Sequence, residues 1–433
     1  MRYSFGFLCV CALGLMPLVG CSETAGTGGS GGTAGMGGTG GADLCEGVAC
    51  QNTQCKTDGV CSPSDGMCDF TLAEDGTVCI DGECLGGVCA PVGAFPCTEQ
   101  GIVDAIAEGG GPHFFACDGT EPVVTTEPIL IDNDVILDGE GKLTVDGNAN
   151  DAGEGHTVFT VAFSDIAVEL RGFGVTGGGC PPDAFGVKQA TGGCFVTGIQ
   201  VDNLSTASKA TLTLTDCVVW NNELQGIYQN VGGTMTLLNT TVSGSGLFNV
   251  HNQGGVLTVI NSTISNGGAF QPEFAAGIRS TGPLTMLNST VSGSEGVGIE
   301  GGTVTLTNCT VSGNARGGID GDTVTLARTI VDGDCSTGVF VSNGYNIESP
   351  GDTCGFDPVG TDQVDVTEGE LNLGDLAANG GPTMTHALGA GSVAIDQIPA
   401  VDCEVTEDQR GEPRPETGGT ICDVGSFEVQ PEL

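Results

Sequence analysis

Residues 211–219 read TLTLTDCVV, and five variants follow: TMTLLNTTV (234–242), VLTVINSTI (256–264), PLTMLNSTV (283–291), TVTLTNCTV (303–311) and TVTLARTIV (323–331). Each copy begins 20 to 27 residues after the previous one. Within each copy, apolar residues alternate with threonine, and this period of two is typical of a short strand with one buried face. The copies therefore predict a repeat that is built from strands.

Two further apolar positions recur and complete the repeat. One follows the alternating residues: Val219, Val242, Ile264, Val291, Val311 and Val331. The other precedes a Gly-rich turn in five copies: Ile227, Val250, Ile278, Ile299 and Ile319. Three inward-facing segments per repeat cannot pair as hairpins and keep their register, but they can coil. We therefore predict an all-β fold over residues 97–433, a single-stranded right-handed parallel β-helix whose coils bury their aliphatic side chains by stacking.

The composition suits a thin core of small aliphatic side chains, because 39% of the 433 residues are hydrophobic and only 5% are aromatic. Eleven basic residues stand against 54 acidic ones, which gives a net charge of -43. This charge argues against nucleic acid or an anionic membrane surface as a partner. It also keeps a large exposed β surface soluble.

The N-terminus carries export signals. Residues 1–20 hold one basic residue, Arg2, and an apolar run that resembles a secretory signal peptide. The run ends in LVGC, which resembles the bacterial lipobox; this resemblance implies a lipoprotein anchored through acyl chains on Cys21. An ordinary signal with a chance cysteine is the alternative. Residues 21–43 then form a Gly-rich tether, and Ser22 is similar to the residue that directs lipoproteins to the outer membrane. We expect a surface-exposed envelope protein.

Residues 44–96 are predicted to form a small disulfide-rich module. Eight cysteines fall within it: Cys45, Cys50, Cys55, Cys61, Cys68, Cys79, Cys84 and Cys89. A module this short buries little, so cross-links replace a core. Zinc is the competing interpretation, but the stretch from Cys45 to Cys89 has no histidine and no CxxC pair. The spacing leaves the connectivity open. The ending DGTVC-x4-C-x4-C loosely resembles disintegrin-like or Dickkopf-like knots, which implies no activity.

Ten further cysteines follow the module. Four local pairs suggest themselves: Cys97 with Cys117, Cys180 with Cys194, Cys335 with Cys354, and Cys403 with Cys422. The remaining two, Cys217 and Cys309, occupy the same repeat position four coils apart, roughly 19 Å at the spacing of strands. No disulfide spans that distance, so we expect two buried thiols.

Two local motifs lie ahead of the regular coils. Ile102, Val103 and Ile106 predict a short helix that caps the first hydrophobic layer. The sequence from Asp146 through Asn148 to Asn150 resembles the start of a calcium loop, although the glycine and glutamate that complete such a loop are missing. It is a weak candidate, and we assign no metal or cofactor.

The C-terminal part contains four ordered motifs: NGGPTMTHAL (379–388), GSVAID (391–396), DQRGEPRP (408–415) and CDVGSFE (422–428). Together they resemble the ending of bacterial choice-of-anchor Q proteins, surface proteins with a β-helix of the pectate-lyase-like superfamily. The resemblance implies a surface location and an ending that closes the helix. It implies no catalytic assignment.

Stacked coils align outward side chains in columns about 4.8 Å apart. The column beside the third apolar position is chemically mixed: Gln200, Tyr228, His251, Arg279, Glu300 and Asp320. Two adjacent carboxylates would suit a retaining glycosidase, with Arg279 holding an anionic sugar. A plain surface ion pair between Arg279 and Glu300 is the alternative. The sequence patterns of pectate lyases and polygalacturonases are absent.

Two other columns are more uniform. The first contains Thr213, Thr236, Thr258, Thr285, Thr305 and Thr325, and it resembles the threonine ranks of insect ice-binding proteins, although threonine is also a favoured strand residue. The second contains Asn239, Asn261, Asn288 and Asn308. We expect these to be turn residues whose side-chain amides hydrogen-bond along the stack. The insertion at 267–277, with Phe270 and Phe274, is a natural contact site, or it folds back onto its coil.

The sequence favours a surface-anchored binding or structural protein, a monomer that contacts glycans or other envelope components. No catalytic constellation is evident, so we lean against an enzyme. The alternative is a polysaccharide lyase or glycoside hydrolase that uses His251, Arg279, Glu300 and Asp320. Ice binding through the threonine column is a third, more distant hypothesis.

Overall fold

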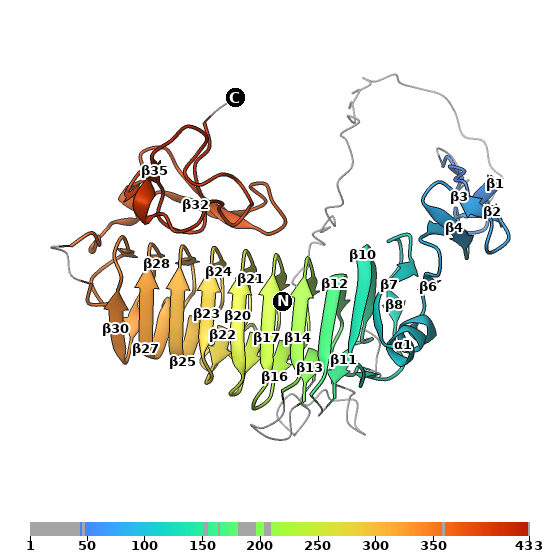
Figure 1. Cartoon of the computed structure of the whole chain (residues 1–433), viewed down its shortest axis with the longest axis horizontal. Coiled ribbons are helices and arrows are strands. Elements are labelled where there is room, and N and C mark those ends of the chain that lie inside the picture. Colours follow the sequence, from blue (N-terminus) through green and yellow to red (C-terminus); the bar gives the residue numbers. More distant parts are fainter. Residues whose placement is uncertain are drawn as a thin grey trace, which may run out of the picture. The chain divides into compact units, whose positions relative to one another are not determined.

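The computed structural model describes residues 44–45, 48–149, 155–162, 165–180, 196–202, 209–356 and 360–431. Twenty-six strands form one continuous sheet system that winds as a parallel β-helix, with the strands of successive coils side by side (Figure 1). No helix within the described ranges is long and apolar enough to cross a membrane.

Each apolar position of the repeat generates its own parallel sheet. Sheet A holds the threonine-rich strands β14 (Thr211–Thr215), β17 (Thr234–Leu238), β20 (Val256–Ile260), β23 (Leu284–Leu287) and β30 (Val339–Ser342). Sheet B holds β15 (Val218–Trp220), β18 (Thr241–Ser243), β21 (Thr263–Ser265), β24 (Thr290–Ser292), β26 (Thr310–Ser312), β28 (Ile330–Asp332) and β31 (Ile347–Ser349). Sheet C holds β13 (Thr197–Val201), β16 (Gln225–Gln229), β19 (Phe248–Asn252), β22 (Ala276–Ser280) and β29 (Cys335–Ser336). The longer strands β25 (Val297–Thr307) and β27 (Ile319–Ala327) run from sheet C into sheet A.

The coils upstream follow the same plan less regularly. The strands β10 (Val135–Asp146) and β12 (Ala167–Thr176) run from sheet A into sheet B. They are accompanied by β7 (Gly110–Ala116) in sheet A, β8 (Val123–Val124) in sheet B, and β9 (Ile129–Ile131) and β11 (Phe159–Val161) in sheet C. A further short strand, β6 (Phe95–Pro96), pairs with β7.

The aliphatic side chains stack in register inside the coils, as predicted. Successive sheet A strands place the same inward position side by side: Leu214, Leu237, Val259, Met286 and Leu306. All five side chains are 0% exposed, and they belong to one continuous hydrophobic core. Each coil therefore buries its apolar face only against its neighbours.

Different structural elements cover the two ends of this core. The predicted cap is helix α1 (Glu99–Glu108), which begins at Thr98, where the Thr98 side chain accepts a hydrogen bond from the Gly101 N–H. Its Ile102 and Ile106 side chains are buried in the core of the first coils. At the other end, Phe356 follows the Cys335–Cys354 disulfide by two residues and is buried in the same core.

The asparagine column forms the predicted turns but not the predicted ladder of amides. Asn239, Asn261, Asn288 and Asn308 have φ between 44° and 50°, a left-handed conformation that asparagine tolerates. The Asn239 amide donates to Asp216 Oδ1 at 3.1 Å. Beyond that step the ladder prediction is wrong, since neither side-chain polar atom of Asn308 has a partner in the described part of the chain.

The side chains that bond along the stack lie one residue later and point inward. Thr240 Oγ1 accepts from the Cys217 N–H, Ser262 Oγ from the Thr240 N–H, and Ser289 Oγ from the Ser262 N–H, at 3.0–3.3 Å. A hydroxyl is short and rotates freely, so it fits this corner of the core and satisfies the buried backbone N–H of the preceding coil. Cys309, in the same column, and Cys217 remain buried free thiols, and burial raises the pKa of each to about 12.

The C-terminal region lies along sheet B and not over the end of the stack (Figure 1). Its elements are α2 (Glu368–Leu371), β32 (Leu373–Ala377), β33 (Thr385–Leu388), β34 (Ile398–Pro399), η1 (Ala400–Asp402) and β35 (Ile421–Cys422). Thr383 Oγ1 donates to the Asn261 carbonyl, and the Ser426 N–H donates to Thr310 Oγ1. These are coils in the middle of the stack, so the expectation that this ending closes the helix is wrong.

Gln409 is the centre of this docking. Its Nε2 donates to Thr263 Oγ1 and Thr383 Oγ1, both at 2.9 Å, and its Oε1 accepts from Thr290 Oγ1 at 2.6 Å. Gln409 is 1% exposed, so every polar atom of the buried amide is engaged. The outward hydroxyls of sheet B, which would otherwise face solvent, thus become an interface.

Charged groups are buried behind this glutamine. Arg414 Nε contacts Glu428 Oε2 at 3.1 Å, and both side chains are buried. Burial raises the pKa of Glu428 to about 7. Arg410 pairs with Asp408 at 2.7 Å and lies 3.7 Å above the Phe427 ring. These contacts link the last two C-terminal motifs to each other.

The disulfide-rich module is held by four cross-links in place of a core. They join Cys45 to Cys61, Cys50 to Cys68, Cys55 to Cys84, and Cys79 to Cys89. Its strands are β1 (Lys56–Cys61), β2 (Cys68–Leu72), β3 (Val78–Cys79), β4 (Gly82–Leu85) and β5 (Val88–Ala90). Further along the chain, disulfides join Cys97 to Cys117 and Cys403 to Cys422, two of the local pairs expected from the sequence. Cys180 is disulfide-bonded, and Cys194 lies outside the described residues.

The stacked core predicts a sharp contrast between neighbouring residues of one strand. Replacing the fully buried Leu237 by alanine leaves a cavity between two coils and should cost about 2–5 kcal/mol of unfolding free energy. Thr236→Ala changes the outward neighbour and should cost less than about 0.5 kcal/mol. Urea unfolding of the oxidised protein measures both. Equal losses in the two variants would contradict the inward and outward assignment.

His386 makes the docking of the C-terminal region depend on pH. Its Nδ1–H donates to the Gly374 carbonyl at 2.7 Å, so Nε2 accepts from Ser292 Oγ at 2.9 Å, which requires a neutral ring. Burial lowers the pKa of His386 below its ordinary 6.5, although nearby Asp332 and Asp375 oppose the shift. A group with a lowered pKa contributes stability above the unfolded value and loses it as the pH falls below that value.

Comparing the melting temperatures of the wild type and His386→Gln isolates this effect. The advantage of the wild type should shrink as the pH falls from 7 towards 5. Glu428 acts with the opposite sign, because its raised pKa favours the protonated folded state in acid, and it is present in both proteins. A wild-type advantage that stays constant across this range would show that His386 is not held neutral.

Candidate functional site

The mixed column forms on the outer face of sheet C in the predicted order. Gln200 pairs with Tyr228, Tyr228 with His251, and His251 with Arg279 in the neighbouring strands. Arg279 then pairs with Glu300, and Glu300 with Asp320. Each residue occupies the outward position next to a buried aliphatic one, so the period of the strand and the register of the coils bring the column together.

Three of the candidate residues line two adjoining grooves. Arg279, Glu300 and Asp320 border both of them. One groove, of about 230 Å³, continues over the Gly301–Gly302 backbone towards Asp322. The other, of about 300 Å³, extends to the residues that precede sheet C: Glu273, Phe274, Ala275, Val297 and Arg316, with Ser336 beyond the carboxylates. The charged half of the column is therefore a ridge between two hollows.

The charged side chains of the ridge are partly exposed and contact one another or a neighbouring hydroxyl. Arg279 Nη2 lies 3.3 Å from Glu300 Oε1, and the two side chains are 38% and 37% exposed. Thr337 Oγ1 donates to Asp320 Oδ1. A surface ion pair of this kind contributes about 1 kcal/mol or less to stability. Both carboxylates are engaged by neighbours of their own, and neither is buried in the way that favours a general acid.

His251 does not join the charged ridge, although it belongs to the column. Its ring lies 5.2 Å from Tyr228 and 4.9 Å from Phe248, centroid to centroid. Its Nδ1–H donates to Gln225 Oε1 at 3.1 Å. Burial, with a smaller contribution from the Arg279 charge, lowers the pKa of His251 to about 4. It is a neutral ring within an aromatic cluster and lines neither groove, so it stands apart from the other three candidates.

The 267–277 insertion projects beside the ridge and does not fold back onto its coil. Phe270 is 46% exposed and Phe274 is 62% exposed. Only Phe274 borders the larger groove. An aromatic face next to hydrogen-bonding groups is a common way to hold a sugar ring, because the ring packs on the apolar face of the sugar.

Sequence reasoning missed Arg316, Phe248 and Thr337. Arg316 borders the larger groove, is exposed, and forms no ion pair with any described carboxylate. It lies in the turn before β27, just as Phe274 lies in the turn before β22. The turns that lead into sheet C lie next to its outward column. The predicted coil topology could therefore have indicated that turn residues such as Arg316 border the site.

The oxygen-rich calcium candidate behaves as an ordinary turn. Asp146 Oδ1 accepts the Asn148 N–H at 2.8 Å, and Asn148 has a positive φ of 62°. Asn150 lies outside the described residues. Cys21, the predicted lipid-bearing residue, lies outside them as well.

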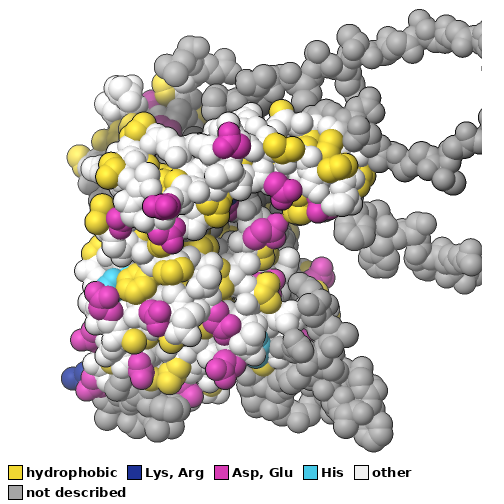
Figure 2. Space-filling view, turned by 90° about the vertical axis from the view of Figure 1, so that its right-hand side faces the viewer, with side chains coloured by type: hydrophobic (Ala, Val, Ile, Leu, Met, Phe, Trp, Pro, Cys, Tyr) yellow, Lys and Arg dark blue, Asp and Glu magenta, His cyan; other side chains and the backbone are white. Residues whose placement is uncertain are grey.

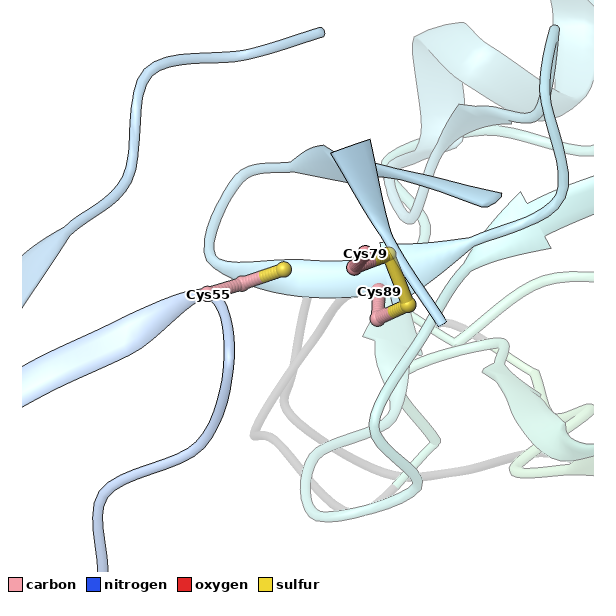
Figure 3. Close-up of side chains that lie close together, drawn as sticks. All are labelled: Cys55, Cys79 and Cys89. Carbon is pink, nitrogen blue, oxygen red and sulfur yellow. A yellow bond between two sulfur atoms is a disulfide. The ribbon is translucent and has the colours of Figure 1, made fainter. Parts of the chain in front are cut away.

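One cluster of potential metal ligands occurs in the described ranges, and it consists of sulfur atoms. The Sγ atoms of Cys55, Cys79 and Cys89 lie within 4.8 Å of one another (Figure 3). Cys79 is bonded to Cys89 and Cys55 to Cys84, whereas a metal requires thiolates. In this oxidised form the cluster is the centre of the disulfide module and not a metal site.

Acidic side chains far outnumber basic ones in this protein. Figure 2 shows them scattered over one face, with basic side chains only at an edge. Most of the described basic residues are engaged in ion pairs, as Lys56 is with Asp118 and Arg328 with Glu404. Of the two arginines of the larger groove, Arg279 is paired with Glu300, whereas Arg316 pairs with no described carboxylate.

Comparison with protein-family models agrees with the fold. Residues 197–353 match the model of a family described as "Right handed beta helix region". A crystal structure of pectate lyase Pel9A is similar with a TM-score of 0.41 and 14% identity, covering 76% of this chain and 90% of that chain. No curated protein matches the chain. The chain is thus an all-β protein that contains a right-handed parallel β-helix with repeated coils and disulfide bonds.

Proposed function

We propose that this protein is a surface-anchored lipoprotein whose β-helix binds a glycan through the charged ridge and the larger groove. The observation that carries the proposal is the meeting of exposed Phe274 with Arg279 and Arg316 around a hollow of about 300 Å³. An exposed aromatic ring and two arginines supply the stacking and hydrogen bonds that hydroxyl-rich ligands need, and Glu300 and Asp320 add hydrogen-bonding oxygens that an amide would retain.

The N-terminal sequence supports the proposal that glycan binding takes place at the cell surface. The lipobox-like LVGC motif would attach Cys21 to the membrane, and the Gly-rich tether would separate the β-helix from the lipid. The C-terminal motifs, which resemble those of choice-of-anchor Q proteins, favour the same surface location. The net charge of -43 disfavours nucleic acid as the ligand.

A polysaccharide lyase or glycoside hydrolase is the second candidate, favoured by one observation. Glu300 and Asp320 are neighbours in register on parallel strands, a spacing of about 4.8 Å that is close to the separation of carboxyl groups in retaining glycosidases. The contacts with Arg279 and Thr337 favour binding over catalysis.

Two phenylalanines of the same insertion give a matched test of binding. Phe274→Ala should weaken retention of the full chain on immobilised polysaccharides about tenfold or more, because aromatic contacts contribute roughly 1–2 kcal/mol. Phe270→Ala, which alters an exposed ring outside the groove, should leave retention unchanged. Removing 267–277 should weaken retention at least as much as Phe274→Ala. Equal behaviour of the two alanine variants would contradict the proposed site.

The carboxylates separate binding from catalysis. Glu300→Gln and Asp320→Asn should leave glycan retention largely intact, and the wild type should release no new reducing or unsaturated ends from a broad panel of polymers, with and without calcium. Depolymerisation that is lost in either variant would instead establish the enzymatic alternative.

A further inference from the structure

The outer face of sheet B carries the one tryptophan of the chain. Trp220 is the outward residue at the end of β15, and it is only partly buried. No aromatic or cationic side chain of the described part stacks on it. Its indole N–H donates to no residue within the described ranges. The indole N–H is therefore available to a ligand that packs on the ring.

A glycine on the neighbouring coil makes room for the ring. A Cβ atom on Gly174 would lie 3.0 Å from both Cζ3 and Cη2 of Trp220. Gly174 is itself an outward position of sheet B, in register with Val218. The indole therefore reaches back over the preceding coil and covers this position.

Hydroxyl groups flank the ring on both sides. Thr176 and Ser243 are the register neighbours of Trp220 on the preceding and following coils, and both are partly exposed. Thr241 provides a third hydroxyl beside them. None of these residues is charged, in a protein whose net charge is -43.

Sheet B has two outward columns here, one through Val218 and Thr241 and one through Trp220 and Ser243. Further along the stack, the C-terminal region covers both columns. The hydroxyls that bond to the C-terminal region are those of Thr263, Thr290 and Thr310 in the first column and Ser292 in the second. The polar face that begins at Trp220 is thus continuous with an established interface but has no occupant from the described C-terminal residues. What remains is a partly exposed indole with a free N–H and a row of hydroxyls beside it. The column has a carboxylate at its near end, where Asp146 is the register neighbour of Thr176.

We propose that Trp220, with Thr176 and Ser243, is a second carbohydrate site, which takes an uncharged pyranose residue. The apolar face of the sugar packs on the indole, while its hydroxyls bond to the indole N–H and the flanking side chains. The site lies on a different sheet from the ridge of Arg279 and does not depend on the function proposed for that ridge. A neutral sugar is expected because an acidic one gains no cation here and meets the repulsion of the whole protein.

The single tryptophan permits a direct test, because all indole emission comes from this position. The full oxidised chain should be titrated with neutral oligosaccharides of glucose, xylose, mannose and N-acetylglucosamine, with oligogalacturonate as the anionic comparison. We expect a saturable change in emission with at least one neutral oligosaccharide and none with oligogalacturonate. No change with any neutral oligosaccharide would overturn the proposal.

Variants then assign the signal to the site. In calorimetry with the same oligosaccharide, Trp220→Ala should lower the affinity at least about tenfold. Gly174→Ala, whose Cβ would press on the ring and on Thr144 Oγ1, should also weaken binding and alter the emission. Thr213→Ala, a matched hydroxyl loss on sheet A, should change neither. Phe274→Ala should leave the emission response intact, so failure here is distinguishable from failure at the ridge. Unchanged affinity in Trp220→Ala would refute the assignment.

Discussion

In-register stacking of aliphatic side chains between successive coils is the interaction on which the rest of the structure depends. No coil has a core of its own, since its leucine, valine and isoleucine side chains are buried only by the coils on either side. The stacking fixes the register, and the register in turn fixes which outward side chains become neighbours. Core packing therefore brings Arg279, Glu300 and Asp320 together in the ridge, because it sets the register of their strands.

The outer faces of the three sheets are used in different ways. Sheet A exposes a uniform column of threonines, in register from Thr213 to Thr325. Sheet B exposes hydroxyls that the C-terminal region covers over several coils, with Gln409 as the central contact. Sheet C exposes the mixed column and receives the side chains of the preceding turns. A protein with few basic residues concentrates two of its exposed arginines beside this column.

Much of this organisation could be predicted from the sequence, because period-two patterns and repeat spacing report strand direction and stacking. The inward residues, the mixed column and the two unpaired cysteines follow from that logic, and the capping helix follows from the helical spacing of Ile102 and Ile106. The ladder of side chains that bond along the stack was predicted at Asn239 and its equivalents, but it is formed one residue later, by Thr240, Ser262 and Ser289. Sequence spacing does not reveal which residue of a tight turn points inward. The docking of the C-terminal region on sheet B was also missed, because it depends on long-range contacts such as Gln409 with Thr263. Arg316 escaped notice because turns carry no periodic signal.

The register of the coils can be measured by cross-linking outward positions of sheet A. Thr258 and Thr285 are direct neighbours on adjacent coils, whereas Thr236 lies two coils from Thr285. Adjacent strands are about 4.8 Å apart and a disulfide spans at most about 7 Å between Cα atoms, so only the first pair lies within reach. Peptide mapping of Thr258→Cys/Thr285→Cys should reveal a new disulfide between the two introduced cysteines. In Thr236→Cys/Thr285→Cys both introduced cysteines should remain free thiols, as the native Cys217 and Cys309 are. A disulfide in the second pair, or none in the first, would contradict the stacked register.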